Sequence, residues 1–164
     1  MLLDCRVQAE DFSLAAQSSA LQLALGASTG AVASFVGCVR AAPGTAAQGD
    51  FLALELQHYP GMSQRCVQAL GQDCAQRFAL QGLCIIHRYG YLPAGEQIVL
   101  VLAAAAHRKA ALQAVDYAMD QLKSAIPFWK KEHWQNSSLW VQAKAQDLAH
   151  LAAWQAVGTT DLQA

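Results

Sequence analysis

Three segments of the chain carry apolar residues at helical spacing. In residues 107–126 the apolar positions recur every three or four residues, at Ala111, Val115, Ala118, Leu122 and Ile126. Pro127 should end this helix, because a proline disfavours helical geometry in the residue before it. Shorter helices are predicted over residues 12–25 and from about residue 63 to 78.

Continuous or alternating apolar runs between these helices predict strands, at residues 2–8, 31–39, 51–57, 83–89 and 97–105. The run at 31–39 has the composition of a mostly buried strand, and residues 91–95 that of a turn. Residues 129–132 and 139–143 should pair as two short strands, and residues 146–157 can form a further helix. Few strand–helix–strand units are long enough for a parallel sheet. The predicted fold class is therefore α+β with a mostly antiparallel sheet.

The composition is unusually apolar for one domain of 164 residues. Apolar residues make up 54% of the chain and charged residues 14%, against roughly 25% charged in typical soluble domains. The longest apolar run, residues 98–106, is too short to span a membrane, which needs about 20 residues. Since the first residues also lack a basic signal-peptide region, we expect a cytoplasmic protein with an apolar interface between copies. The part after about residue 144 should be peripheral to the single domain 1–164.

Charge and cysteine content exclude several classes of function. The net charge is −1 with no basic stripe, so nucleic-acid binding has no electrostatic support. The five cysteines form no CxxC pair and match no zinc spacing, which favours reduced thiols and predicts neither a metal nor a cofactor. Phosphate-binding glycine loops and serine-hydrolase motifs are also missing from the sequence.

Lysines gather around one proline turn. The chain has five lysines, and three of them lie in residues 122–132 beside Pro-Phe-Trp. In a continuous helix Lys123 and Lys130 would be about 10 Å apart, but a turn at Pro127 could bring them together against apolar walls. A desolvated lysine, or one beside another cation, becomes a usable base or nucleophile. The alternative is that Lys123 is a surface cation favoured by the helix C-terminus.

A second basic group, His107-Arg108, opens the long helix after a buried strand. Free N–H groups at that end, together with these side chains, make a candidate phosphate site, although an ordinary polar pair leaving a strand is an equal alternative. Arg108 and Lys123 are roughly 22 Å apart along one helix, so the two groups serve separate sites or meet across two copies. The apolar composition favours the shared site. Arg40, at a strand end before a loop, is a further candidate ligand contact, and His87-Arg88 ranks below His107-Arg108.

These motifs, in their order, resemble the large, catalytic subunit of molybdopterin synthase, the MoaE family. The matching stretches cover roughly residues 30–143: FVGCVR at 35–40, LELQHYPGM at 54–62, IHRYG at 86–90, PAGE at 93–96, AHR at 106–108, MDQLK at 119–123 and PFWKKE at 127–132. The resemblance implies an α/β hammerhead-like fold and an enzyme, a sulfurtransferase. Its substrate would be cyclic pyranopterin monophosphate, and its sulfur donor the C-terminal thiocarboxylate of a small ubiquitin-like subunit ending in Gly-Gly. It also implies a homodimer within a heterotetramer.

Residue by residue, the resemblance implies that Lys123 and Lys130 are catalytic and that Arg40, His107 and Arg108 bind substrate, the last two from the neighbouring copy. Leu139 stands where some relatives have an arginine, and Lys131 or His133 is expected to compensate. Ala104-Ala105 replaces small hydroxyl residues of relatives, which predicts a weaker helix cap or a lost phosphate contact. The chain ends in DLQA, so the sulfur must come from a partner.

Two other functions fit part of this pattern. A non-catalytic oligomeric module that binds a ubiquitin-like tail or a phosphorylated ligand would also combine an apolar surface with basic clusters. In such a module Lys123→Ala has no turnover to abolish. A phosphoesterase is the weaker alternative, because the sequence shows no metal-ligand cluster of the kind that this chemistry commonly uses.

Overall fold

The computed structural model describes residues 1–141 and Trp154, and it has three α-helices and eight strands in this part of the chain. The helices are α1 (Leu14–Leu25), α2 (Met62–Arg77) and α3 (Arg108–Ser124), with a short 3₁₀ helix at Gly26–Ser28. The strands are β1 (Leu2–Gln8), β2 (Ala31–Cys38), β3 (Phe51–His58), β4 (Gly82–Arg88), β5 (Gly90–Pro93), β6 (Gln97–Ala105), β7 (Phe128–Trp134) and β8 (Ser138–Val141). No helix within this region is long and apolar enough to cross a membrane.

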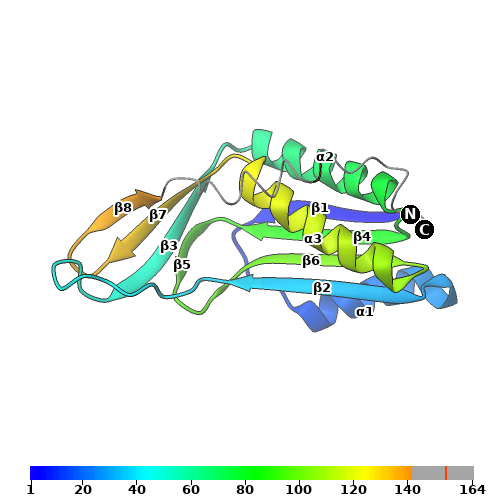
Figure 1. Ribbon diagram of the computed structural model, residues 1–164, viewed down its shortest axis with the longest axis horizontal. Helices are drawn as coiled ribbons and strands as arrows, with labels where there is room; N and C mark the ends of the chain where they lie inside the picture. The colour runs from blue at the N-terminus through cyan, green and yellow to red at the C-terminus, as the bar shows by residue number, and fades with distance from the viewer. Residues whose placement is uncertain (142–153, 155–164) are drawn as a thin grey trace.

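The strands form two four-stranded sheets, which lie end to end in Figure 1. The larger sheet has the order β1-β4-β6-β2, and the smaller one β5-β3-β7-β8. Strands β1 and β4 run parallel, and every other neighbouring pair is antiparallel. The prediction of an α+β fold with mostly antiparallel sheet is confirmed.

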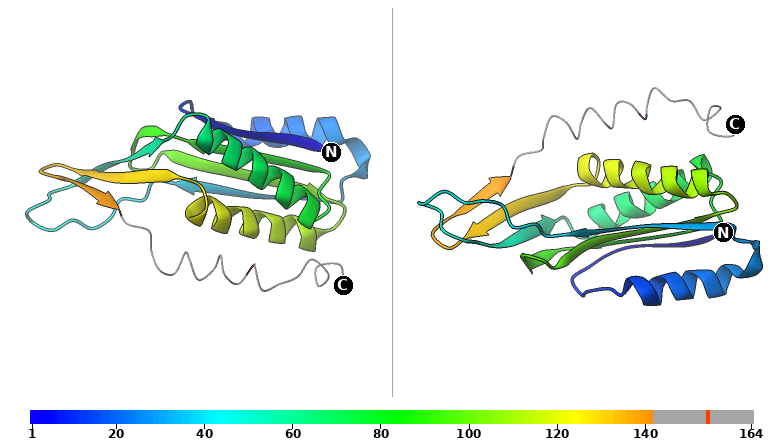
Figure 2. Two further views of the ribbon diagram at one scale, coloured as in Figure 1. Left: turned by 90° about the horizontal axis from the view of Figure 1, so that it is seen from above. Right: turned by 60° about the horizontal axis from the view of Figure 1, so that its bottom comes forward.

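Helices cover both faces of the larger sheet. In the right view of Figure 2, α2 and α3 lie on one face and α1 on the other. The two central strands are therefore enclosed on both sides, which explains why every residue of β4 and nearly every residue of β6 is buried. Ser13 caps α1 by accepting a hydrogen bond from the N–H of Ala16.

Two local predictions were wrong. Residues 31–38 form an edge strand, β2, in which only Ala33 is buried, because it has a neighbouring strand on one side only. Residues 90–93 form strand β5 instead of a turn, since they pair with β3. The hairpin of β7 and β8 is confirmed as far as Val141. The helix expected at residues 146–157 falls outside the described residues, apart from Trp154.

Candidate active site

A pocket of about 220 Å³ lies where the two sheets meet the end of α3, and both candidate lysines line it. We call it the lysine pocket. Lys123 comes from the last turn of α3, and Lys130 from β7. The helix ends at Ser124, and the chain turns through Pro127 into β7, so the predicted turn does bring Lys130 back to the pocket that Lys123 lines.

Apolar side chains make up most of the remaining wall. They come from both sheets, from α3 and from the turn that follows it: Phe35, Ile98, Val99, Met119, Leu122, Ile126 and Phe128. Apolar walls exclude water from part of the pocket, which strengthens the interaction of the lysine ammonium groups with an anionic ligand. Part of the wall belongs to β2, the edge strand of the larger sheet, where Phe35 is 40% exposed.

His87, at the end of β4, is a wall residue that the sequence ranked too low. Its ring is 7% exposed and stacks on Phe128, with ring centroids 4.0 Å apart and planes 14° from parallel. Burial lowers the pKa of His87 to about 4. The hydrogen bond to the Arg88 carbonyl acts in the opposite direction, and the charge of Lys130 adds to the decrease. A signal was present in the sequence, since a histidine continuing the apolar run GLCII is a polar group at a buried position.

Arg88, by contrast, is structural. Its guanidinium donates to the carbonyl oxygens of Ala9 and Gln97 and forms ion pairs with Asp11 and Glu96. These contacts join the end of β4 to the segment that follows β1 and to the start of β6. The sequence could not separate the roles of the two neighbours, because their side chains point to opposite faces of the strand.

The remaining basic candidates lie at different distances from the lysine pocket. Arg40 is exposed and lies two residues beyond Cys38, which lines the pocket. His107 is the N-cap of α3, makes no side-chain cap hydrogen bond, and is exposed together with Arg108. These two residues are at the opposite end of α3 from Lys123, roughly 22 Å away along the helix axis, and they do not line the pocket within one chain.

Lys131 and His133 project from β7 on the face opposite to Lys130. The Lys131 ammonium lies 5.5 Å from the centre of the Trp140 ring. His133 Nε2 lies 2.6 Å from a carboxylate oxygen of Glu55. Leu139 pairs with Glu132 and so shares the face of Lys130. Neither Lys131 nor His133 lies on the face of Leu139, so the compensation expected of these two residues would have to act from the other face of the hairpin.

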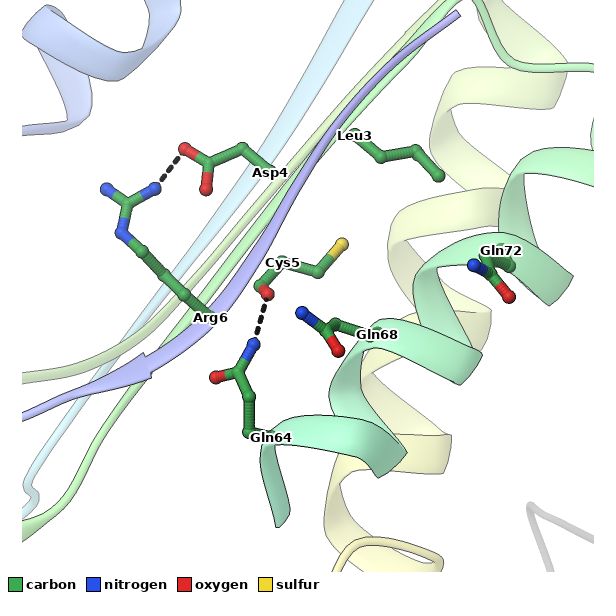
Figure 3. A pocket seen from close by; sticks show the side chains of 7 residues that line it. All are labelled: Leu3, Asp4, Cys5, Arg6, Gln64, Gln68 and Gln72. Carbon is green, nitrogen blue, oxygen red and sulfur yellow. Dashed lines mark hydrogen bonds and ion pairs between the residues drawn. The ribbon is translucent and has the colours of Figure 1, made fainter. Parts of the chain in front are cut away.

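A larger pocket, of about 560 Å³, lies between β1 and α2 (Figure 3). The side-chain amide of Gln64 bridges the edge of β1 there, donating to the Cys5 carbonyl at 2.8 Å and accepting from the Val7 N–H at 2.9 Å. Arg6 pairs with Asp4. Burial raises the pKa of the Cys5 thiol to about 11, which leaves no thiolate at neutral pH. The pocket therefore offers hydrogen-bonding amides but no activated nucleophile.

No group of three or more histidine, cysteine or acidic side chains in the described part of the chain could hold a metal ion.

Comparisons with known proteins agree on one family. The family model described as MoaE protein matches residues 7–125. A relative from Mesorhizobium japonicum, named molybdopterin synthase catalytic subunit, is 46% identical over 151 residues, covering 91% of each chain. The solved molybdopterin cofactor biosynthesis protein E from Burkholderia multivorans is 39% identical, with a TM-score of 0.78 over 96% of this chain and 100% of that chain. The solved molybdopterin synthase from Staphylococcus aureus is 26% identical, with a TM-score of 0.74 over 84% of this chain and 96% of that chain. The chain belongs to the MoaE protein family.

Proposed function

We propose that this chain is the catalytic subunit of a molybdopterin synthase. It transfers sulfur from the C-terminal thiocarboxylate of a small ubiquitin-like subunit to cyclic pyranopterin monophosphate and so builds the dithiolene of molybdopterin. The observation that carries the proposal is that Lys123 and Lys130, from two different elements, line one partly apolar pocket. The five free thiols fit a reducing compartment, and we place the enzyme in the cytoplasm.

The lysine pocket suits a thiocarboxylate that must react with a phosphorylated substrate. The ammonium groups attract the charged tail of the small subunit and hold its sulfur near the substrate carbon. Sulfur attack on a substrate carbon forms a C–S bond while a C–O bond of that carbon breaks and the departing oxygen takes up a proton, so the two molecules are then joined by a thioester. Water then opens the thioester, which leaves the sulfur on the pterin and a carboxylate on the small subunit. Lys123 handles the acyl group and the proton transfers, and Lys130 stabilises the negative charge that develops.

Arg40, His107 and Arg108 bind the cyclic phosphate in this proposal, and Lys131 is an outer contact for the substrate. Arg40 lies two residues beyond Cys38 of the pocket wall, and in this proposal it contacts the substrate from its own chain. His107 and Arg108 are too far along α3 to do so, because roughly 22 Å separates them from Lys123. A second copy must therefore supply them.

The open edge of β2 offers a geometry for this second copy. Strand β2 ends beside the lysine pocket, and α3 packs on β2 and β6. Since β2 and α3 run in the same direction, antiparallel pairing of two β2 strands would place the start of one α3 beside the end of the other. His107 of one copy would then approach Lys123 of its partner. The half-exposed ring of Phe35 would be covered by the same contact.

Single-turnover product formation tests this function. The protein is mixed with cyclic pyranopterin monophosphate and thiocarboxylated small subunit, beside the variants Lys123→Ala and Arg65→Ala. Arg65 is an exposed cation on α2 and does not line the pocket, so it controls for the loss of one positive charge. We expect dithiolene product from the wild type and Arg65→Ala, and none from a folded Lys123→Ala that still binds the small subunit. A wild type that binds the small subunit without turnover would instead support a non-catalytic binding module.

A further inference from the structure

His87 is held in one orientation at the wall of the lysine pocket. Its ring is stacked on Phe128 at 4.0 Å, and the ring is almost fully buried. The His58 ring belongs to the same aromatic cluster, with its centroid 6.3 Å from that of Phe128. The imidazole therefore has little freedom to turn, and its hydrogen-bonding atoms keep fixed directions.

The tautomer of His87 follows from its one backbone partner. Nδ1 lies 2.9 Å from the carbonyl oxygen of Arg88. A carbonyl oxygen only accepts hydrogen bonds, so Nδ1 carries the proton and donates. In a neutral imidazole the lone pair is then on Nε2. The ring stays neutral at physiological pH, because burial opposes its protonation and the nearby cation Lys130 repels a second charge.

The charged and titratable groups around this ring come from several elements. Lys130 comes from β7, Lys123 from α3, His58 from β3 and Cys38 from β2. Lys130 follows Phe128 by two residues, so both side chains project from the same face of β7, the face that stacks on His87. Lys130 is therefore the cation best placed to meet a lone pair on Nε2.

We infer that His87 is a positioning residue, whose neutral imidazole accepts a hydrogen bond from the Lys130 ammonium at Nε2 and holds that ammonium in the lysine pocket. The bond keeps the charge of Lys130 directed at the ligand without adding a second cation. It also opposes the withdrawal of the flexible lysine into solvent. The effect of His87 on turnover rests on the proposed function, but the bond itself does not.

Two amide variants separate this role from packing. In His87→Gln the longer side chain brings an amide oxygen close to the position of Nε2. In His87→Asn the shorter side chain can replace only the Nδ1 donor to Arg88. Both variants lose the aromatic stacking on Phe128, and His87→Asn also leaves a cavity one methylene larger, so the acceptor is read from the titration of Lys130 and not from stability.

The first readout is the titration of the lysine Cε signals by NMR in selectively labelled protein. The chain has only five lysines, and Lys130→Arg assigns the relevant signal. A neutral acceptor stabilises the ammonium form, so we expect the pKa of Lys130 to fall by about 0.5 to 1 unit in His87→Asn and to stay near the wild-type value in His87→Gln. An unchanged Lys130 titration in His87→Asn, or equal shifts in both variants, would overturn the inference.

The second readout is the single-turnover rate with the thiocarboxylated small subunit and the pterin substrate. We expect roughly a tenfold loss in His87→Asn and a smaller loss in His87→Gln, since a hydrogen bond to a charged group is worth that much. Equal rates in two variants of equal folded stability would count against the inference. If the wild type shows no turnover while the Lys130 titration still follows the acceptor, the proposed function fails and the positioning role stands.

Discussion

Lowering the pH from 7 to 5 should destabilise the fold through His87. Burial depresses the pKa of this imidazole from 6.5 to about 4 in the folded protein. Between these two values the unfolded chain binds a proton that the folded chain does not bind. The free energy of unfolding therefore falls as the pH falls through this window, and it is unaffected by His87 above it.

The size of the effect follows from the same two values. A depression from 6.5 to about 4 amounts to roughly 3 kcal/mol when fully expressed, at about 1.4 kcal/mol per pH unit. Only part of it develops by pH 5, where the expected loss is about 2 kcal/mol relative to pH 7. Solvent screens the His87 imidazole only weakly, because this residue is 7% exposed, so the full free-energy difference applies.

Urea unfolding at pH 7 and pH 5, at one fixed protein concentration, measures the loss. His87→Gln is the reference, because glutamine does not titrate while every other ionisable group is retained. The wild type should lose about 2 kcal/mol more than the variant between the two pH values. Equal losses in both proteins would mean that His87 is not held neutral in the folded state, and the account of the pocket wall would be wrong.

Three further predictions concern packing and thiol reactivity. A Cβ at Gly71 would lie 2.4 Å from the Cys5 sulfur, so Gly71→Ala should lower the free energy of unfolding in urea by about 1 to 3 kcal/mol. Adding Cys5→Ala should recover part of this loss, and strictly additive losses in the double variant would refute the clash. Trp154→Ala should lower stability by about 2 kcal/mol, since its ring packs against two other aromatic rings and donates a hydrogen bond, whereas Trp140→Ala, at a 55% exposed position, should cost clearly less. The exposed Cys38 should react fastest with a disulfide reagent, and a fast phase that persists in Cys38→Ser would contradict this assignment.

Local sequence signals predicted the elements well, because those signals act over a few residues. The turn at Pro127 and the hairpin of β7 and β8 follow from proline geometry and short-range spacing, and the structure has both. The shared pocket of Lys123 and Lys130 followed from the same turn. The separation of His107 from Lys123 followed from helix geometry alone.

The predictions for residues 31–38 and for His87 failed because the surroundings of these residues are set by segments far away along the chain. The composition of residues 31–38 is that of a buried strand, but whether β2 is central or at an edge is decided by its order in the sheet. His87 ranked low because a histidine that continues an apolar run indicates burial but does not by itself indicate a ligand site. Its importance comes from Phe128, forty-one positions later, which turns back and stacks on it.

The Gln64 bridge on β1 also protects part of one edge of the larger sheet from pairing with another chain. A sheet with two free edges can add copies at both ends without limit, which leads to fibres. Here the side chain of Gln64 already occupies the outward backbone groups of Cys5 and Val7, as a neighbouring strand would. A chain that paired its own strand with this part of β1 would first have to displace the Gln64 amide, so the bridge opposes self-association at this edge.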